Sequence, residues 1–219
     1  MTGSAAFYKD SHNIYRAPSL DRFEWLVHGF GTRHAPDIAA IPNLAILHQI
    51  HSDICVSARG QSGRLGEGDA LLENTPGHLV GVKTADCIPV LFADEEHRAV
   101  AAVHAGWRGT LAAIVRAAIE KMRSEFATRP AALHAAIGPG IGKCCYQVGA
   151  EVAVQFGESG PAKIDLAEAN RRLLVHAGVP EAQICVAGLC TMCGGGDFHS
   201  YRRDKERAGR MLSFLGVKP

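Results

Sequence analysis

The chain of 219 residues lacks long apolar runs. Its polar start, residues 1–16, contains nothing like the apolar core of a signal peptide. No later segment reaches the roughly 18 uninterrupted apolar residues that a membrane-spanning helix requires. We therefore expect a cytoplasmic protein without a membrane partner.

The sequence also lacks an excess of charge of either sign, since 23 Lys and Arg residues stand against 22 Asp and Glu residues. Such a chain has neither a bulk basic field that attracts nucleic acid nor an acidic tail that repels it. We expect a small or neutral molecule as its partner, no nucleic acid, and no obligate protein partner.

The seven cysteines form an odd set in a chain without an export signal, so a disulfide framework explains them poorly and we expect chemical roles for some of them. Cys190 and Cys193 are spaced as in half of a zinc ribbon or a redox pair. The sequence has no second C-x-x-C motif, so packing or loop structure is the better interpretation. Cys144 and Cys145 are adjacent, and adjacent side chains on an extended segment diverge, so we do not expect them to bind one metal together.

Hydrophobic residues make up 47% of the chain, enough for a substantial core, and no repeat or long linker divides it. We therefore expect one domain over residues 1–219. Helices interspersed irregularly among many strands, without steady βαβ alternation, predict an α+β fold with mixed sheets rather than a doubly wound fold.

Segments rich in Val, Ile and Leu, each bounded by turn residues, predict strands at 44–47, 79–83, 88–92, 99–104, 133–137 and 184–187. We assign the final amphipathic stretch, 210–217, to a strand as well. Helical spacing of apolar residues predicts a long helix over 109–126. A capping box that starts at Asp165 predicts a second helix, which should end at Gly178.

Three reactive side chains, His51, Cys87 and His104, lie where predicted strands end. Strand ends hold side chains rigidly while leaving them open to a ligand, so the three could converge. One thiolate and two imidazoles make a three-ligand zinc set that leaves a fourth position for water or substrate, as catalytic sites do. Cys87 could instead be a nucleophile with His104 as its base, or the three could be a buried cysteine and two satisfied histidines.

Two acids accompany these residues, Asp69 and Asp86. Either could orient a histidine that binds a metal, or simply cap a turn. The sequence does not choose between these roles.

Eight short motifs follow one another over nearly the whole chain: HGFGTR (28–33), QIH (49–51), GDA (68–70), TADCIP (84–89), HAGWRG (104–109), IGP (137–139), CCYQVG (144–149) and SYRRD (200–204). In this combination the chain closely resembles the YfiH-like family, also called the laccase-domain or polyphenol oxidase family. It departs from the usual pattern of that family at Gly140, Lys143 and His199, which concerns substrate preference more than metal binding.

The resemblance implies a zinc site, with copper as the alternative metal, in which His51, Cys87 and His104 are both metal ligands and catalytic residues. It implies a layered α/β/β/α body similar to the catalytic domain of a bacterial deamidating toxin. It also implies phosphorolysis of purine nucleosides to free base and ribose 1-phosphate, with accompanying adenosine deaminase activity. Adenosine and inosine are the expected substrates, and 5'-methylthioadenosine is a further candidate.

Phosphorolysis requires fixed donors for phosphate, a task that suits the guanidinium fork of arginine. Arginines within the matched motifs are therefore candidate phosphate ligands: Arg33, Arg108, Arg202 and Arg203. Each could equally be part of a structural ion pair. Tyr146 is expected to face the pocket and to contact the substrate.

Three other functions remain open at this point. The kinship with the deamidating toxin keeps a metal-free Cys-His amide hydrolase or deamidase in view. Copper-dependent phenol oxidation is suggested by the old family name, although the His-x-His clusters of multicopper oxidases are absent from the sequence. A structural zinc or interaction module would need no catalysis at all.

Overall fold

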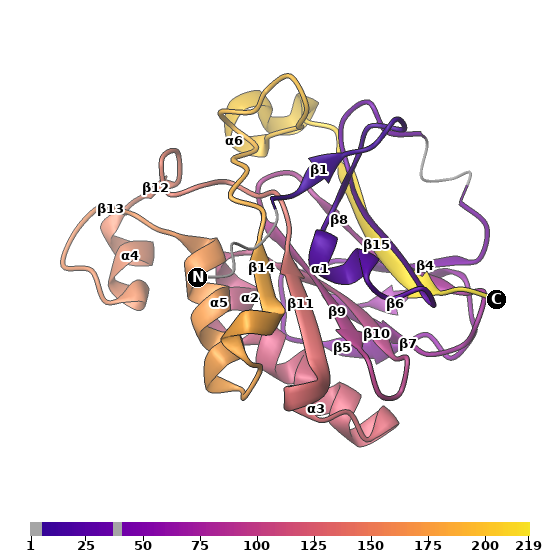
Figure 1. Ribbon diagram of the computed structural model, residues 1–219. Helices are drawn as coiled ribbons and strands as arrows, with labels where there is room; N and C mark the ends of the chain where they lie inside the picture. Colours follow the sequence, from indigo (N-terminus) through magenta and orange to yellow (C-terminus); the bar gives the residue numbers. More distant parts are fainter. Residues whose placement is uncertain (1–5, 37–40) are drawn as a thin grey trace.

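Two mixed β-sheets pack face to face at the centre of the molecule (Figure 1). The computed structural model describes residues 6–36 and 41–219. The seven-stranded sheet has the order β1 (Tyr8–Lys9), β2 (Ile14–Arg16), β3 (Leu26–Gly31), β15 (Met211–Val217), β8 (Leu79–Thr84), β4 (Leu44–His48) and β6 (Gly63–Glu67). The six-stranded sheet has the order β14 (Ile184–Val186), β11 (Leu133–Ile137), β9 (Ile88–Asp94), β10 (Val100–Ala105), β7 (Ala70–Glu73) and β5 (Cys55–Ser57). A separate two-stranded sheet consists of β12 (Gln147–Val148) and β13 (Ala162–Lys163).

Both large sheets contain parallel and antiparallel pairs. In the seven-stranded sheet β15 is antiparallel to both of its neighbours, while β4 is parallel to both of its own. In the six-stranded sheet the outer pairs β11·β14 and β5·β7 are parallel and the central pairs are antiparallel. The predicted α+β class with mixed sheets is therefore confirmed.

Strands β9 and β10 are buried on both faces, which is why their sequences are continuous apolar runs without alternation. Along β9, Leu91 packs between the two sheets and Phe92 packs on the opposite face against the helices. Both side chains are fully buried, and each contributes about 2–3 kcal/mol by removing its apolar surface from water. This double-sided core gives the ends of β9 and β10 a rigid support.

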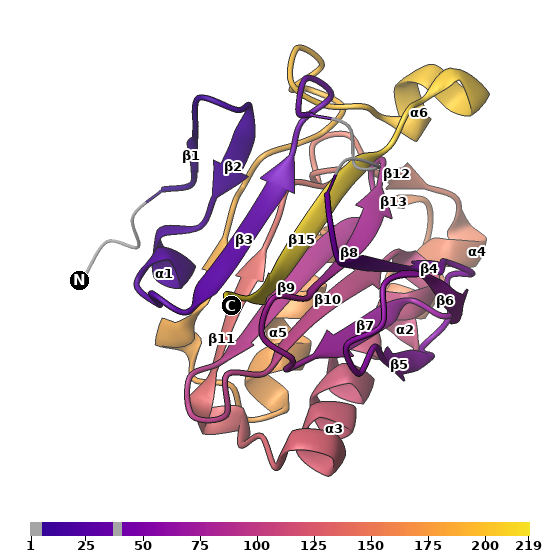
Figure 2. The ribbon, with the colours of Figure 1, turned by 90° about the vertical axis from the view of Figure 1, so that its right-hand side faces the viewer.

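Helices cover the outer face of the six-stranded sheet (Figure 2). They are α2 (Trp107–Leu111), α3 (Ile114–Phe126) and α5 (Leu166–His176). Shorter helices are α1 (Pro18–Asp21), α4 (Ala150–Ala153) and α6 (Tyr201–Asp204), with 3-10 turns at Pro130–Ala132, Val154–Phe156, Glu181–Gln183 and Lys205–Arg207. On the outer face of the other sheet, the described residues form a small apolar cluster centred on Leu44, Leu212 and Phe214.

The single helix predicted over 109–126 is wrong, because the structure has two helices there. The break falls between Leu111 and Ile114, where Ala113 adopts a left-handed conformation with φ of +56°. Apolar positions on the two sides of the break keep helical spacing, so periodicity alone does not reveal it.

The other predicted elements are confirmed, with ends that shift by a residue or two. The side chain of Asp165 accepts a hydrogen bond from the backbone N–H of Glu168 at 3.0 Å, which is the expected cap at the start of α5. The final stretch forms β15. Within residues 6–36 and 41–219, no helix combines the length and the apolar content that crossing a membrane demands.

Candidate active site

The three predicted reactive residues come from three separate strand ends. His51 follows β4, Cys87 lies in the connection between β8 and β9, and His104 is near the end of β10. His51 has φ of +61°, and Asp86, just before Cys87, has φ of +88°. Non-glycine residues rarely adopt such angles, and they concentrate at functional sites where the surrounding structure enforces them.

The structure brings these three side chains together. One donor atom from each lies within 4.8 Å of the others, and Cys87 Sγ is 4.0 Å from His51 Nε2. The rings of His51 and His104 meet edge to face at 4.9 Å between centroids. A Cβ atom on Gly106 would lie 3.0 Å from Cys87 Sγ and 3.1 Å from His51 Cδ2, so only glycine leaves the cluster this compact.

Asp69 holds two of the three residues, His104 and His51, in position by hydrogen bonds. Its Oδ1 lies 2.7 Å from His104 Nδ1, which directs the other ring nitrogen toward Cys87. The same carboxylate accepts hydrogen bonds from the backbone N–H groups of His51 and Ser52 and from the Ser52 hydroxyl, which fixes the loop after β4. Burial opposes ionisation, but hydrogen bonds from His104 and Ser52 prevail and lower the pKa of Asp69 to about 2. Asp69 therefore orients a histidine.

Asp86 has a different role. It accepts hydrogen bonds from the Thr191 hydroxyl at 2.6 Å, the Ser200 hydroxyl at 3.1 Å and the Arg202 backbone N–H at 2.6 Å. All three donors come from the C-terminal part of the chain, more than 100 residues later in sequence. Asp86 thereby attaches those loops to the segment that carries Cys87.

The thiol of Cys87 is biased toward the thiolate. Burial raises its pKa, but the neighbouring His104 and His51 outweigh burial and lower it to about 6. Burial lowers the pKa of His104, whereas Asp69 and Cys87 raise it to about 9. A thiolate next to a carboxylate-oriented imidazole suits both metal binding and nucleophilic attack.

The donor set fits a transition metal. In tetrahedral zinc sites, Zn–S bonds of about 2.3 Å and Zn–N bonds of about 2.0 Å place S and N donors about 3.5 Å apart. The observed 4.0 Å between Cys87 Sγ and His51 Nε2 is close to that value. His104 also has the carboxylate partner on its second nitrogen that metal-bound histidines usually have. These residues could hold a metal ion with small side-chain movements.

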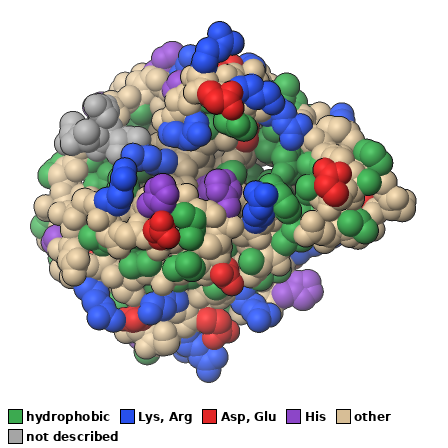
Figure 3. Space-filling view, turned by 180° about the vertical axis from the view of Figure 1, so that it is seen from behind, with side chains coloured by type: hydrophobic (Ala, Val, Ile, Leu, Met, Phe, Trp, Pro, Cys, Tyr) green, Lys and Arg blue, Asp and Glu red, His purple; other side chains and the backbone are tan. Residues whose placement is uncertain are grey.

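The three residues open into a large cavity, with a volume of about 950 Å³. Six cationic side chains line it: Arg64, Lys83, Arg108, Arg202, Lys205 and Arg210. Among the described lining residues the only carboxylate is Asp86, whose oxygens already accept hydrogen bonds. On the face drawn in Figure 3, histidines and basic side chains surround a hollow. Such a cavity favours an anionic ligand.

Three of the predicted substrate residues line this cavity: Arg108, Tyr146 and Arg202. The guanidinium of Arg202 lies 5.3 Å from the centroid of the Tyr146 ring, and its Nη1 donates to the Gln147 carbonyl at 2.8 Å. Arg108 stacks on Trp107 at 4.3 Å. Burial raises the pKa of Tyr146 to about 12, so its hydroxyl remains protonated and able to donate.

Arg33 and Arg203 do not line the cavity. Arg33 donates to the Gly195 carbonyl at 3.2 Å and lines a separate cavity of about 410 Å³. Arg203 pairs with Asp204 at 2.8 Å and donates to the Phe198 carbonyl at 2.9 Å. Both guanidinium groups hold loops in place, which is the structural alternative that the sequence left open.

The three departures from the family pattern also lie outside the cavity lining. At Gly140 a Cβ atom would meet Ile88 Cδ1 at 2.3 Å, so this position serves close packing. His199 lines the smaller cavity together with Arg33. Lys143 is exposed.

Sequence reasoning did not identify four of the cavity's cations: Arg64, Lys83, Lys205 and Arg210. They come from β6, β8, a 3-10 turn and the residue just before β15. All four fall outside the matched motifs. Nothing in their local sequence distinguishes them from solvated surface charges. Only the tertiary fold brings them to one cavity.

Comparisons with known proteins agree on one family. Residues 32–218 match the family model described as "Multi-copper polyphenol oxidoreductase laccase". A "Purine nucleoside phosphorylase" of Deinococcus radiodurans is 43% identical over 188 residues, covering 81% of this chain and 72% of the relative. "Adenosine deaminase RL5" from an unknown prokaryotic organism is 39% identical over 171 residues, covering 72% and 64%.

Solved structures of proteins with related names have the same fold. The crystal structure of Bacillus licheniformis hypothetical protein YfiH superposes with a TM-score of 0.86 at 27% identity, covering 97% of this chain and 99% of that one. Because the family model matches residues 32–218, well over half of the chain, and the structural match covers 97% of it, the chain belongs to the laccase-domain family of YfiH-like proteins.

Proposed function

We propose that this chain is a zinc-dependent purine nucleoside phosphorylase with accompanying adenosine deaminase activity. Its substrates would be adenosine and inosine, with 5'-methylthioadenosine as a further candidate, and its products the free base and ribose 1-phosphate. Relatives named for the two activities support the reaction class. The observation that carries the proposal is a metal-type donor cluster that opens into a cavity lined by cations.

The donor chemistry supports zinc as the metal. One thiolate and two imidazoles match the borderline-soft character of zinc, and three protein ligands leave one position open. His51, Cys87 and His104 would hold it, with Asp69 orienting His104. When bound, zinc would supply Lewis-acid stabilisation of developing negative charge and lower the pKa of a bound water.

The chain's own residues would bind and orient the reactants. Arg108 and Arg202 would hold phosphate by charge-assisted hydrogen bonds, and the other cations of the cavity would raise its local concentration. Tyr146 and Trp107 present aromatic surface on which a purine can stack. The protonated Tyr146 hydroxyl is available as a donor to the substrate.

In phosphorolysis, a phosphate oxygen forms a bond to the anomeric carbon of the ribose while the bond from that carbon to the purine nitrogen breaks. The departing base takes the bonding electron pair and receives the proton that the attacking hydrogen phosphate gives up. Hydrogen-bond donors that face the cavity would stabilise the charge that develops on the base. In deamination, water would replace the amino group at the purine C6 position, which releases ammonia.

The decisive experiment incubates the protein with adenosine, with and without phosphate, and follows adenine, inosine and hypoxanthine by chromatography. We expect phosphate-dependent release of adenine or hypoxanthine, and its loss in Cys87→Ala together with the one metal ion that His51, Cys87 and His104 would hold. Cys55→Ser, a cysteine outside the cluster, is the matched control and should retain both. A zinc-loaded, folded protein that turns over no purine nucleoside would contradict the proposal.

A second candidate is a metal-free amide hydrolase or deamidase. It is favoured by the lowered pKa of Cys87 and by the sequence of contacts from Cys87 to His104 to Asp69, which resembles a nucleophile, base and orienting acid. Activity on an amide that survives thorough chelation but is abolished by thiol alkylation would favour this candidate. The third alternative, copper-dependent phenol oxidation, would require oxygen uptake with a phenol by the copper-loaded protein.

A further inference from the structure

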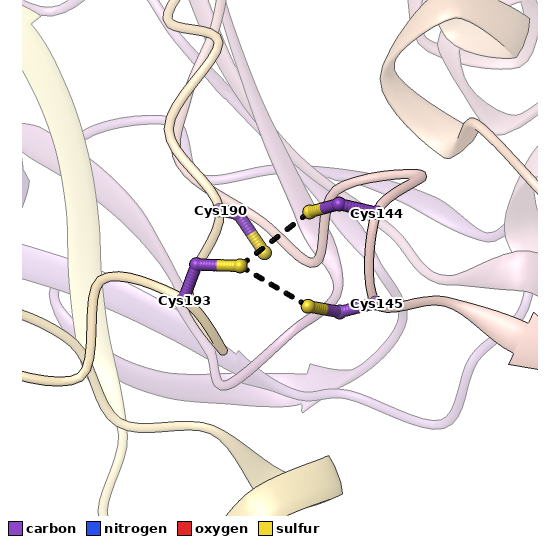
Figure 4. Close-up of side chains that lie close together, drawn as sticks. All are labelled: Cys144, Cys145, Cys190 and Cys193. Carbon is purple, nitrogen blue, oxygen red and sulfur yellow. Dashed lines mark hydrogen bonds between the residues drawn. The ribbon is translucent and has the colours of Figure 1, made fainter.

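A second cluster of possible metal ligands lies apart from the first and consists of four cysteines: Cys144, Cys145, Cys190 and Cys193. Figure 4 shows their sulfur atoms pointing toward one another from two loops. All four sulfurs lie within 4.8 Å of one another. We propose that these cysteines form a four-thiolate structural zinc site, which is independent of the His51, Cys87 and His104 site.

The local backbone explains why sequence reasoning missed this cluster. The adjacent Cys144 and Cys145 were expected to diverge, as on a strand, but residues 143–145 form a turn. The N–H groups of Cys145 and Tyr146 both donate to the Gly142 carbonyl, at 2.9 and 3.0 Å. In this tight turn neighbouring side chains do not alternate between faces, so the expectation that the two cysteines diverge is corrected by the geometry.

The spacing of the sulfurs suits one tetrahedral ion. Four thiolates at about 2.3 Å from zinc lie about 3.8 Å apart. The distances from Cys193 Sγ are 3.6 Å to Cys144 Sγ and 3.2 Å to Cys145 Sγ. One sulfur is thus close to two partners at once, an arrangement that a shared central ion accounts for better than separate pairs do.

The cluster also has the hydrogen bonding of a metal-thiolate site. The backbone N–H of Gly142 donates to Cys190 Sγ at 3.2 Å. A Cβ atom on Gly142 would lie 3.1 Å from Cys190 Cβ and 3.2 Å from Cys144 Sγ, so glycine permits the two loops to approach. N–H donors to ligand sulfurs stabilise the anionic thiolates that a metal requires.

The position of the cluster gives it a consequence for the active site. One loop leads directly into Tyr146, which lines the large cavity, and the other contains Thr191, which donates to Asp86 beside Cys87. An ion that joins these loops would hold Tyr146 and Asp86 in their positions. We therefore assign the cysteines a positioning role.

The first test is the zinc content of protein purified under reducing conditions. We expect about two zinc ions per wild-type chain, about one in Cys87→Ala, and about one in Cys190→Ser/Cys193→Ser. Cys55→Ser should keep both ions, because Cys55 belongs to neither cluster. A Cys87→Ala protein that is folded but free of zinc, or one that carries iron in place of zinc, would overturn the proposal.

The second test uses the folded Cys87→Ala protein and so does not depend on the stability of the double variant. Cobalt added to it should produce the intense sulfur-to-cobalt charge-transfer absorption of a multi-thiolate site. Zinc should protect the four cysteines from alkylation, as followed by peptide mass spectrometry. Equal alkylation with and without zinc, or disulfides among the four cysteines in the reduced preparation, would count against the site.

Discussion

Asp69 Oδ1 lies 2.7 Å from His104 Nδ1, and both side chains are buried. A carboxylate in this position selects the tautomer of the imidazole and increases its basicity toward a metal. We expect Asp69→Asn to lower zinc affinity about 10- to 100-fold, since the amide keeps the shape but loses the charge. Competition with a chromogenic chelator measures this, and Asp53→Asn, an exposed acid nearby, should leave affinity unchanged.

The lack of a side chain at Gly106 supports a second prediction. In Gly106→Ala the added methyl group would press on Cys87 Sγ and the His51 ring. We expect weaker zinc binding and a loss of about 1–3 kcal/mol of folding stability, as overpacking typically causes. Gly160→Ala is the matched control, because a Cβ there meets nothing within 4 Å. Unchanged zinc affinity in Gly106→Ala would show that the cluster is less tightly packed than the structure indicates.

The division of the arginines can be tested by kinetics. Arg108 lines the large cavity and Arg33 does not. We expect Arg108→Ala to raise the KM for phosphate about 10- to 100-fold, the usual effect of losing a charge-assisted hydrogen bond. Arg33→Ala should leave the KM for phosphate unchanged. The reverse result would move the phosphate site away from His51, Cys87 and His104.

His28 should make stability depend on pH. Burial is the main cause that lowers its pKa to about 4 from the usual 6.5, with Arg16 acting in the same direction and Asp21 opposing it. The backbone N–H of Ala17 donates to its Nε2 at 3.0 Å, which requires that nitrogen to be unprotonated. The unfolded chain therefore binds a proton more readily than the folded chain between these two pH values.

The direction of the pH dependence follows from this difference in proton binding between the folded and the unfolded chain. The contribution of neutral His28, up to about 3 kcal/mol, is fully present above pH 6.5 and is lost as the pH falls toward 4. We expect His28→Gln to flatten this part of the curve of melting temperature against pH. His12→Gln, at an exposed histidine, should retain the wild-type slope. An unchanged slope in His28→Gln would assign the acid sensitivity to other groups.

Sequence reasoning succeeded where the signal was local. Apolar runs located β9 and β10 because both faces of these strands are buried, and the capping box located the start of α5. It failed where distant segments meet. Lys83 and Lys205 become cavity residues only through tertiary packing. The turn at Cys144 and Cys145 depends on hydrogen bonds to the Gly142 carbonyl, which the types of the neighbouring residues do not predict. Arg202 and Arg203 lie in the same matched motif, yet Arg202 lines the large cavity and Arg203 pairs with Asp204.

Strand β15 is the last strand in sequence order, yet it lies between β3 and β8 in the middle of the seven-stranded sheet. A chain without these residues would hold two unpaired strand edges, those of β3 and β8, and β8 is the strand that leads to Cys87. The proposed metal site would therefore form only after β15 has joined the sheet, and zinc retained at His51, Cys87 and His104 by a chain truncated before Met211 would contradict this order.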